Sequence, residues 1–213
     1  MSNLSTPLIT DVWLKSAWED YLKIIVNPKF AKAKCYFYQD YMRIEMSPVG
    51  HDHAADNSLV DFIVQLFCTL KGIAFKGLAN CSYRIPGERE CQPDLSYYLQ
   101  EQAQVIPWGT AVVDLNQFPT PNLAIEIAVS SLLDDRGNKR FLYEELGVTE
   151  YWVVDVEKAR VLAYQITNRG SQRIDESQVL TGLPIAIVEE ALRRSRQGDR
   201  AQVGAWLLTQ FQN

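Results

Sequence analysis

The sequence has few residues that bind zinc and no long apolar run. Its 213 residues include two histidines and four cysteines, and no CxxC pair or His-rich segment accompanies Cys35, Cys68, Cys81 and Cys91. This pattern argues against a zinc site. No apolar stretch approaches the ~20 residues of a membrane helix, and residues 1–10 lack the basic and apolar regions of a secretory leader. We therefore expect a cytoplasmic protein with reduced cysteines and no membrane partner.

An excess of positive charge is also lacking. The formal net charge of -5 at pH 7 argues against indiscriminate binding to nucleic acid, because neutralising phosphates requires clustered Lys and Arg. A local basic cleft remains compatible with this balance. The strongest basic cluster lies near the C-terminus, where a solvated helix face is the alternative interpretation, and consists of Arg193, Arg194, Arg196 and Arg200.

The pattern of apolar residues predicts one α/β domain over 1–213, with a core at about 34–166 and helical extensions at 1–33 and 184–213. Helical spacing predicts helices over 11–25, from 52 or 53 to 70, over 134–146, 188–196 and 201–211. Alternation predicts a hairpin within 34–46 and strands over 73–75, 81–85, 93–99, 122–129, 150–155 and 160–166, with loops over 86–90 and 100–121. The expected architecture is a mixed central sheet flanked by helices.

Glu126 lies in the middle of a segment that otherwise reads as a buried strand. Alternation divides the side chains of this segment between two faces. One face consists of Leu123, Ile125, Ile127 and Val129, and the other consists of Ala124, Glu126 and Ala128. Two small neighbours leave space beside the carboxylate. A desolvated carboxylate needs a nearby cation or a shifted pKa. The candidate cations are a metal ion, Lys139 and Arg140.

Asp94 and Lys139 complete a candidate constellation with Glu126. Asp94 follows Pro93 at the start of a predicted strand. If the two acidic strands are neighbours, both carboxylates converge on one divalent ion, and such oxygen ligands suit Mg²⁺ or Mn²⁺. Lys139 would then supply positive charge to a transition state. The alternatives are a polar residue at a strand entrance for Asp94 and a semi-buried Glu126–Lys139 ion pair.

The helix predicted over 134–146 places three polar side chains on one face. Asp135, Lys139 and Tyr143 are spaced four residues apart, so they can point together toward the sheet edge. A solvated helix face is the alternative interpretation of this spacing.

An ordered series of segments resembles the Uma2 family. The series consists of Pro93-Asp94, the Leu-Ala-Ile-Glu-Ile of 123–127, the Asp-Arg-Gly-Asn-Lys of 135–139, Tyr143, and the Gly-Val-Thr-Glu-Tyr-Trp-Val-Val-Asp of 147–155. Upstream, the Met-Ser-Pro-Val-Gly of 46–50 followed by His53 is also similar. The resemblance extends from about residue 36 to 166, and its specificity comes from the order of the segments rather than from one motif.

The resemblance implies a PD-(D/E)xK restriction-endonuclease-like fold, in which a mixed sheet holds two acids between two helices. By position, Asp94 is the first acid and Glu126 the second, and both are implied metal ligands. Ala128 stands where the general pattern has a lysine, and Lys139 is the implied replacement from the following helix.

Glu45 and His53 are secondary candidates. Glu45 is a possible further acidic ligand at a strand end, and His53 could bind phosphate or metal-bound water near a helix N-terminus. A capping or surface role is the alternative for each. His51 is expected to be exposed.

The function expected from this resemblance is metal-dependent hydrolysis of DNA. The alternative is a catalytically inactive nuclease-like scaffold that binds nucleic acid or a protein partner. Because cutting two strands usually calls for two active sites, we also expect a homodimer. Aromatic and apolar residues of the first and last helices are its candidate interface, unless they pack within their own chain: Trp13, Trp18, Tyr21, Trp206, Leu207 and Phe211.

Overall fold

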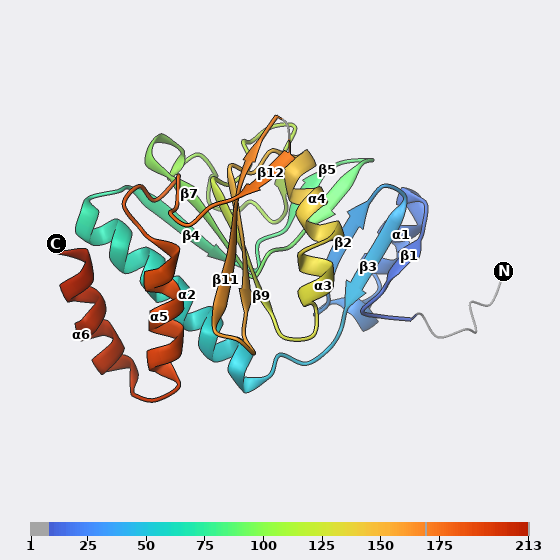
Figure 1. The fold of residues 1–213 in the computed structure, drawn as a ribbon. Coiled ribbons are helices and arrows are strands. Elements are labelled where there is room, and N and C mark those ends of the chain that lie inside the picture. The colour runs from blue at the N-terminus through green and yellow to red at the C-terminus, as the bar shows by residue number, and fades with distance from the viewer. Residues whose placement is uncertain (1–8, 169, 213) are drawn as a thin grey trace.

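The fold is a central mixed sheet with helices on both faces and a second sheet packed on one of them (Figure 1). A computed structural model describes residues 9–168 and 170–212. The central sheet has the order β12-β11-β10-β9-β7-β4, with β9 and β10 parallel and the other pairs antiparallel. Its strands are β4 (Phe75–Ala79), β7 (Leu95–Leu99), β9 (Leu123–Ala128), β10 (Glu150–Asp155), β11 (Arg160–Thr167) and β12 (Gly170–Arg173).

The second sheet has the order β1-β3-β2-β6-β5-β8, in which only β5 and β8 pair in parallel among the described strands. Its strands are β1 (Trp13–Lys15), β2 (Lys34–Tyr38), β3 (Tyr41–Glu45), β5 (Tyr83–Ile85), β6 (Arg89–Cys91) and β8 (Val113–Asp114). The predicted hairpin is confirmed as β2 and β3. Its turn residues Gln39 and Asp40 both have positive φ, a conformation that Asp adopts more readily than most residues.

The helices lie on both sides of the central sheet. Their bounds are α1 (Trp18–Ile25), α2 (His51–Lys71), α3 (Leu132–Asp135), α4 (Asn138–Leu146), α5 (Ile185–Ser195) and α6 (Arg200–Phe211), with single turns of 3-10 helix at Pro28–Phe30 and Gln100–Gln102. One apolar core joins α2, α5 and α6 to the sheet, and a second joins the opposite face to α4 and the second sheet. In the residues described, no helix has the length and apolar character needed to cross a membrane.

The alternation predicted for the Glu126 strand is confirmed. Leu123, Ile125 and Ile127 belong to the core beneath α2, whereas Ala124 and Ala128 belong to the core on the Glu126 side. Val129 departs from the pattern, because β9 ends at Ala128 and the Val129 side chain is exposed.

Two predicted helices differ from the structure. Of the helix expected over 11–25, only Trp18–Ile25 is helical, because Trp13–Lys15 instead pairs with the edge of β3. The helix expected over 134–146 is broken between α3 and α4 at Gly137. A Cβ atom at Gly137 would lie 3.0 Å from the Leu133 carbonyl oxygen, a tight contact that favours glycine at the break.

Strand predictions also need smaller corrections. The strand expected over 73–75 begins at Phe75 and continues to Ala79. The loop expected over 86–90 ends earlier, because β6 begins at Arg89. The α2 prediction is confirmed, and the helix ends where Gly72 adopts the left-handed conformation with φ of 66°.

The aromatic residues expected at a dimer interface are used within the chain. Tyr21, Leu207 and Phe211 are buried. Trp18 packs on Phe37, and Trp206 packs against the core beneath α5 and α6. Trp13 packs edge-on against Tyr36. Packing within the chain therefore accounts for these residues, and they give no support to an interface.

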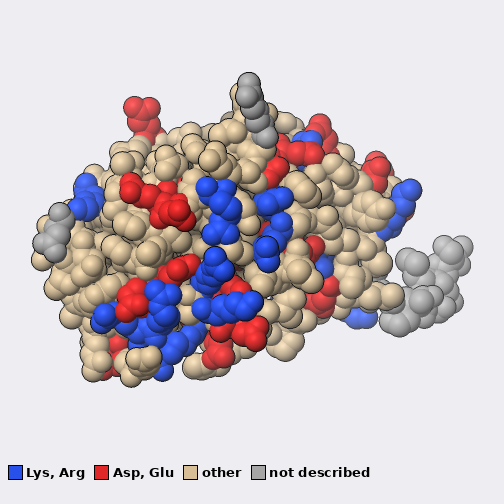
Figure 2. Space-filling model, in the orientation of Figure 1, with Lys and Arg blue, Asp and Glu red and all other residues tan. Residues whose placement is uncertain are grey.

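The arginine cluster near the C-terminus also has internal partners. Arg196 forms two bonds to Asp56 of α2, at 2.9 and 2.6 Å, and Arg193 and Arg194 bond Glu190. Figure 2 shows Lys and Arg mixed with Asp and Glu on the face where α5 lies in Figure 1. Arg196 therefore joins the end of α5 to α2, whereas the bonds of Arg193 and Arg194 lie within α5.

We predict that Arg196→Met lowers the free energy of unfolding by about 2–3 kcal/mol, because it leaves the buried Asp56 carboxylate without its guanidinium partner. The matched control is Arg193→Met, since the Arg193 side chain is 49% exposed and exposed pairs contribute about 0–1 kcal/mol. Urea unfolding of both variants measures the difference. Equal stabilities would contradict the bracing role of Arg196.

Candidate active site

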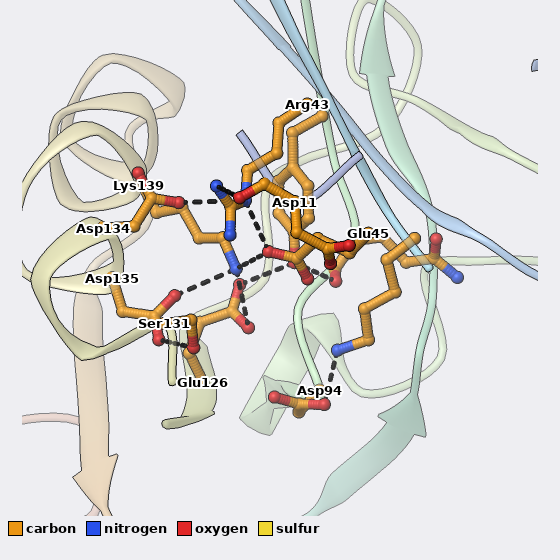
Figure 3. Close-up of polar contacts among 12 residues, drawn as sticks. Asp11, Arg43, Glu45, Asp94, Glu126, Ser131, Asp134, Asp135 and Lys139 are labelled. Atoms are coloured by element: carbon orange, nitrogen blue, oxygen red, sulfur yellow. Dashed lines mark hydrogen bonds and ion pairs between the residues drawn. The ribbon is translucent and has the colours of Figure 1, made fainter. Parts of the chain in front are cut away.

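The site is a cavity of about 620 Å³ between the two sheets and the N-terminus of α2. All five predicted site residues line it: Glu45, His53, Asp94, Glu126 and Lys139. They come from β3, α2, the residue before β7, β9 and α4 respectively. Figure 3 shows four of these side chains, those of Glu45, Asp94, Glu126 and Lys139, directed toward one region.

The sheet register explains why Asp94 and Glu126 come together. Strands β7 and β9 are antiparallel neighbours in which Leu95 is opposite Ile125. Continuing this register by one residue places Asp94 opposite Glu126. Directly opposed residues have Cβ atoms about 4.5–5.5 Å apart on the same face. The two acidic strands are therefore neighbours, which is the condition for their carboxylates to converge.

Asp94 is a buried carboxylate whose two oxygens both have partners. Oδ2 accepts a 2.8 Å bond from the Ile127 backbone N–H, and Oδ1 contacts the Lys34 ammonium and lies 3.3 Å from His53 Nε2. Burial alone would raise the pKa of Asp94. The hydrogen bond from His53 and the charge of Lys34 outweigh burial and hold that pKa well below its ordinary value. Asp94 is thus ionised and held against the β9 backbone.

Glu126 is buried among hydroxyl donors and one ammonium group. Its Oε1 accepts a 2.7 Å bond from the Tyr143 hydroxyl and lies 3.1 Å from the Tyr36 hydroxyl. Its Oε2 lies 3.7 Å from Lys139 Nζ, so Lys139 is the candidate cation that lies beside Glu126. Arg140, the other candidate side chain, instead pairs with Glu144. Burial raises the pKa of Glu126 to about 8, against the lowering effect of Lys139 and Lys34.

Lys139 is held by three carboxylates. Its Nζ lies 2.9 Å from both Glu45 Oε1 and Asp135 Oδ1, in addition to the 3.7 Å contact with Glu126. The side chain is 1% exposed, and these carboxylates overcome the effect of burial and raise the pKa of Lys139 well above its ordinary value. The 3.7 Å separation from Glu126 is inside the limit of ~4–6 Å up to which opposite charges interact appreciably.

The predicted convergence of Asp135, Lys139 and Tyr143 also occurs, although the broken helix divides them. Asp135 ends α3, whereas the other two belong to α4. Asp135 contacts Lys139, and Tyr143 contacts Glu126. All three side chains are buried, so the solvated-face interpretation is wrong.

The secondary candidates occupy different places in the site. Glu45 Oε1 accepts a 2.7 Å bond from Arg43 as well as contacting Lys139, which makes Glu45 a link between these two cations. His53 contacts Asp94 through Nε2, while its buried Nδ1 has no hydrogen-bond partner among the described residues. His51 is 91% exposed, as expected.

The second sheet contributes side chains to the site that the sequence patterns did not indicate. Lys34 contacts Asp94, Tyr36 contacts Glu126, and Arg43 contacts Glu45 and Asp134. The available signal was alternation in β2, which places Lys34 and Tyr36 on one face. Local alternation could not show that this face meets the acids of the central sheet.

The buried charge cluster formed by these contacts carries more negative than positive groups. It contains five carboxylates, those of Glu45, Asp94, Glu126, Asp134 and Asp135, and three cations, Lys34, Arg43 and Lys139. If every carboxylate is ionised, two negative charges are uncompensated. A buried excess of this kind favours protonation or an added cation.

The oxygen donors fit a hydrated divalent ion better than a fully protein-bound one. Within residues 9–168 and 170–212, no three His, Cys, Asp or Glu side chains are grouped as a metal site. Asp94 and Glu126 nevertheless oppose each other on adjacent strands and both line the cavity. Mg²⁺ is commonly held by one or two carboxylates with several waters. Two opposed acids that line one cavity are consistent with that requirement.

We predict that the Glu126→Gln variant becomes more stable relative to the parent protein, both without metal, as the pH rises. The pKa of Glu126 is raised in the folded state from 4.5 to about 8, so its stabilising proton is fully present below pH 4.5 and is lost as the pH rises through about 8. The stability difference should grow by up to about 1.4 kcal/mol per pH unit across that interval. Urea unfolding in the presence of a chelator at pH 5 to 9 measures it. Parallel pH profiles would contradict the raised pKa.

Comparisons with known proteins show which family and which solved structure this chain is similar to. A family model described as "Uma2: Putative restriction endonuclease" matches residues 18–201. The chain is also similar to a crystal structure of a "putative nuclease belonging to DUF820" from Anabaena variabilis ATCC 29413, with a TM-score of 0.57 and 15% identity. That similarity covers 83% of this chain and 98% of the other. No curated protein matches the chain.

The structural similarity confirms the predicted nuclease-like α/β fold, and restriction-endonuclease-like families generally use divalent metal ions. The family match extends well beyond the segments that carry the resemblance, since it begins in α1 and ends in α6. The chain belongs to the Uma2 family.

Proposed function

We propose that this chain is a metal-dependent endonuclease that hydrolyses DNA phosphodiester bonds. The observation that carries the proposal is the convergence of Asp94, Glu126 and Lys139 on one cavity from adjacent strands and the following helix. Family membership supports a nuclease-like activity. The two acids would hold Mg²⁺ or Mn²⁺, and DNA is the proposed substrate.

The side chains around the acids prepare them for this role. A bound divalent ion would polarise the phosphate and lower the pKa of the attacking water. The Ile127 N–H fixes one oxygen of Asp94. The hydroxyl groups of Tyr36 and Tyr143 occupy Oε1 of Glu126, so Oε2, which lies 3.7 Å from Lys139 Nζ, is the oxygen that would contact a metal ion. Fixed donors reduce the reorganisation that the reaction requires.

Lys139 would supply fixed positive charge beside the acids. Its contacts with Glu45 and Asp135 hold the ammonium group, and the same side chain lines the cavity. From this position it would stabilise negative charge that develops on the phosphate. His53 would contact a phosphate oxygen or a metal-bound water, because it lines the cavity beside Asp94.

We predict that Asp94→Ala and Glu126→Ala each abolish Mn²⁺ binding and cleavage while the protein remains folded, because each removes one of two carboxylate ligands. Calorimetric Mn²⁺ titration should be combined with Mg²⁺- or Mn²⁺-dependent assays on several DNA and RNA substrates. Glu101→Ala is the matched control, since the exposed Glu101 follows the opposite end of β7. Both variants binding Mn²⁺ like the parent would end the metal-site proposal.

We predict that Lys139→Arg stays folded and binds Mn²⁺ but loses about 10²-fold or more in turnover. It keeps the charge that the three carboxylates need, while the planar guanidinium changes the shape and hydration of the cation. Lys139→Ala should instead lower the free energy of unfolding by about 3–5 kcal/mol, because it leaves buried carboxylates unpaired. Single-turnover cleavage and urea unfolding separate the two effects. Full turnover in Lys139→Arg would contradict a transition-state role.

A catalytically inactive scaffold that binds nucleic acid or a protein is the second candidate. The nearly complete burial of Lys139 and its contacts with Glu45 and Asp135 support it, because an ion-pair network can be purely structural. The absence of a lysine at Ala128 points the same way. Metal titration distinguishes the candidates, since a structural network would not bind Mn²⁺.

Homodimerisation remains part of the endonuclease proposal. Two active sites are the usual requirement for cutting both strands of a duplex, and a two-fold dimer supplies them. Light scattering at micromolar concentration would give twice the chain mass if this is correct, and a monomeric mass would contradict it.

A further inference from the structure

Lys34 occupies the acid that the proposed function assigns to the metal. It is the first residue of β2, and its ammonium group contacts Oδ1 of Asp94. The same oxygen lies 3.3 Å from His53 Nε2, while Oδ2 accepts the bond from the Ile127 N–H. Both oxygens of Asp94 are therefore engaged before a divalent ion arrives.

An ammonium group and a divalent ion compete for the same carboxylate oxygen. They carry charge of the same sign, and at a separation of a few ångströms their repulsion is strong in a partly buried site. An ion that coordinates Asp94 must therefore weaken or replace the contact with Lys34. The exchange has a low structural cost only if the lysine can withdraw.

Lys34 and Lys139, the two cavity-lining lysines that form ion pairs with acids of the site, differ in this respect. Lys139 is 1% exposed and contacts three carboxylates, so moving it would leave several buried charges unpaired. Lys34 is 18% exposed, and Asp94 is the one acid with which it forms an ion pair among the described residues. Its four-carbon stem is flexible, and the cavity of about 620 Å³ provides space for the ammonium group.

The other partners of Asp94 cannot make way as readily. The Ile127 N–H belongs to β9 in the centre of the sheet. The His53 side chain is 17% exposed, about as much as that of Lys34, but it is a short, rigid ring on helix α2. Of the groups that contact Asp94, Lys34 thus has the longest and most flexible stem.

We infer that Lys34 is an internal counter-ion of Asp94 that a divalent metal must displace, so that Lys34 sets the metal affinity of the site. The inference rests on the proposed function insofar as Asp94 holds the metal. Without metal, Lys34 compensates the Asp94 charge and keeps this buried acid in place. The displacement raises the apparent dissociation constant, so loading of the site requires a higher metal concentration than the two acids alone would require.

The test measures Mn²⁺ affinity of the full-length protein by calorimetry, with the metal alone and no nucleic acid. Lys34→Met keeps the apolar stem and removes the competing charge, so Mn²⁺ should bind on the order of tenfold more tightly. Lys34→Arg keeps a cation at the position and should remain within about threefold of the parent. Lys34→Gln provides a second neutral side chain in case Lys34→Met does not fold, as judged by thermal unfolding.

Lys32→Met is the matched control. Lys32 lines the same cavity and is exposed, and it forms no ion pair among the residues that the structure describes. Its substitution removes the same formal charge from the cavity and should leave Mn²⁺ affinity close to that of the parent.

The outcomes separate this inference from the proposed function. Tighter binding in the neutral Lys34 variants alone supports the competition. If the parent binds Mn²⁺ and these variants bind it no more tightly, the inference is overturned while the metal site stands. Equal tightening by Lys32→Met also overturns it, because the effect would then be general to the charge of the cavity. If neither the parent nor any variant binds Mn²⁺, the proposed function and the inference fail together.

Discussion

The buried carboxylate of Glu126 is the constraint on which the rest of the site depends. It lies in a central strand with alanine on either side along its face, at Ala124 and Ala128, so the strand itself provides no polar partner. Burying such a group without partners costs several kcal/mol. The partners come from elsewhere: Tyr36 from the second sheet, and Lys139 and Tyr143 from α4. The need to satisfy one acid thus explains why α4 and the second sheet cover the same face.

This covering layer gives the two acids different environments. Asp94 contacts Lys34, His53 and a backbone N–H, all of which favour its ionised form. Glu126 receives hydroxyl donors and a more distant ammonium group, which leave burial as the dominant effect on its pKa. Of the two acids, Asp94 is therefore the permanently charged one. Glu126 is the acid whose charge depends on pH or on an added cation.

Sequence patterns were sufficient for the elements that carry the acids, but not for their surroundings. Alternation around Glu126 and the length of α2 are local signals, and the structure confirms both. Helical spacing predicts a helix where the structure has β1. The prediction fails because Trp13-Leu14-Lys15 pairs with the distant residues Tyr41-Met42-Arg43, and tertiary pairing overrides local spacing. The same limit applies to Lys34, because its distance from Asp94 depends on how the two sheets pack rather than on any pattern within β2.

The placement of the lysine on a helix makes the site depend on a backbone break. A lysine at Ala128 would reach Glu126 directly along the strand, whereas Lys139 reaches it from α4. Gly137 separates α3 from α4 through its close approach to the Leu133 carbonyl, and Asp135 at the end of α3 still contacts Lys139. The break therefore orients a short helix whose Lys139 and Tyr143 both face Glu126. Because these contacts come from one helix, movement of α4 would change the charge compensation and the hydrogen bonding of Glu126 together.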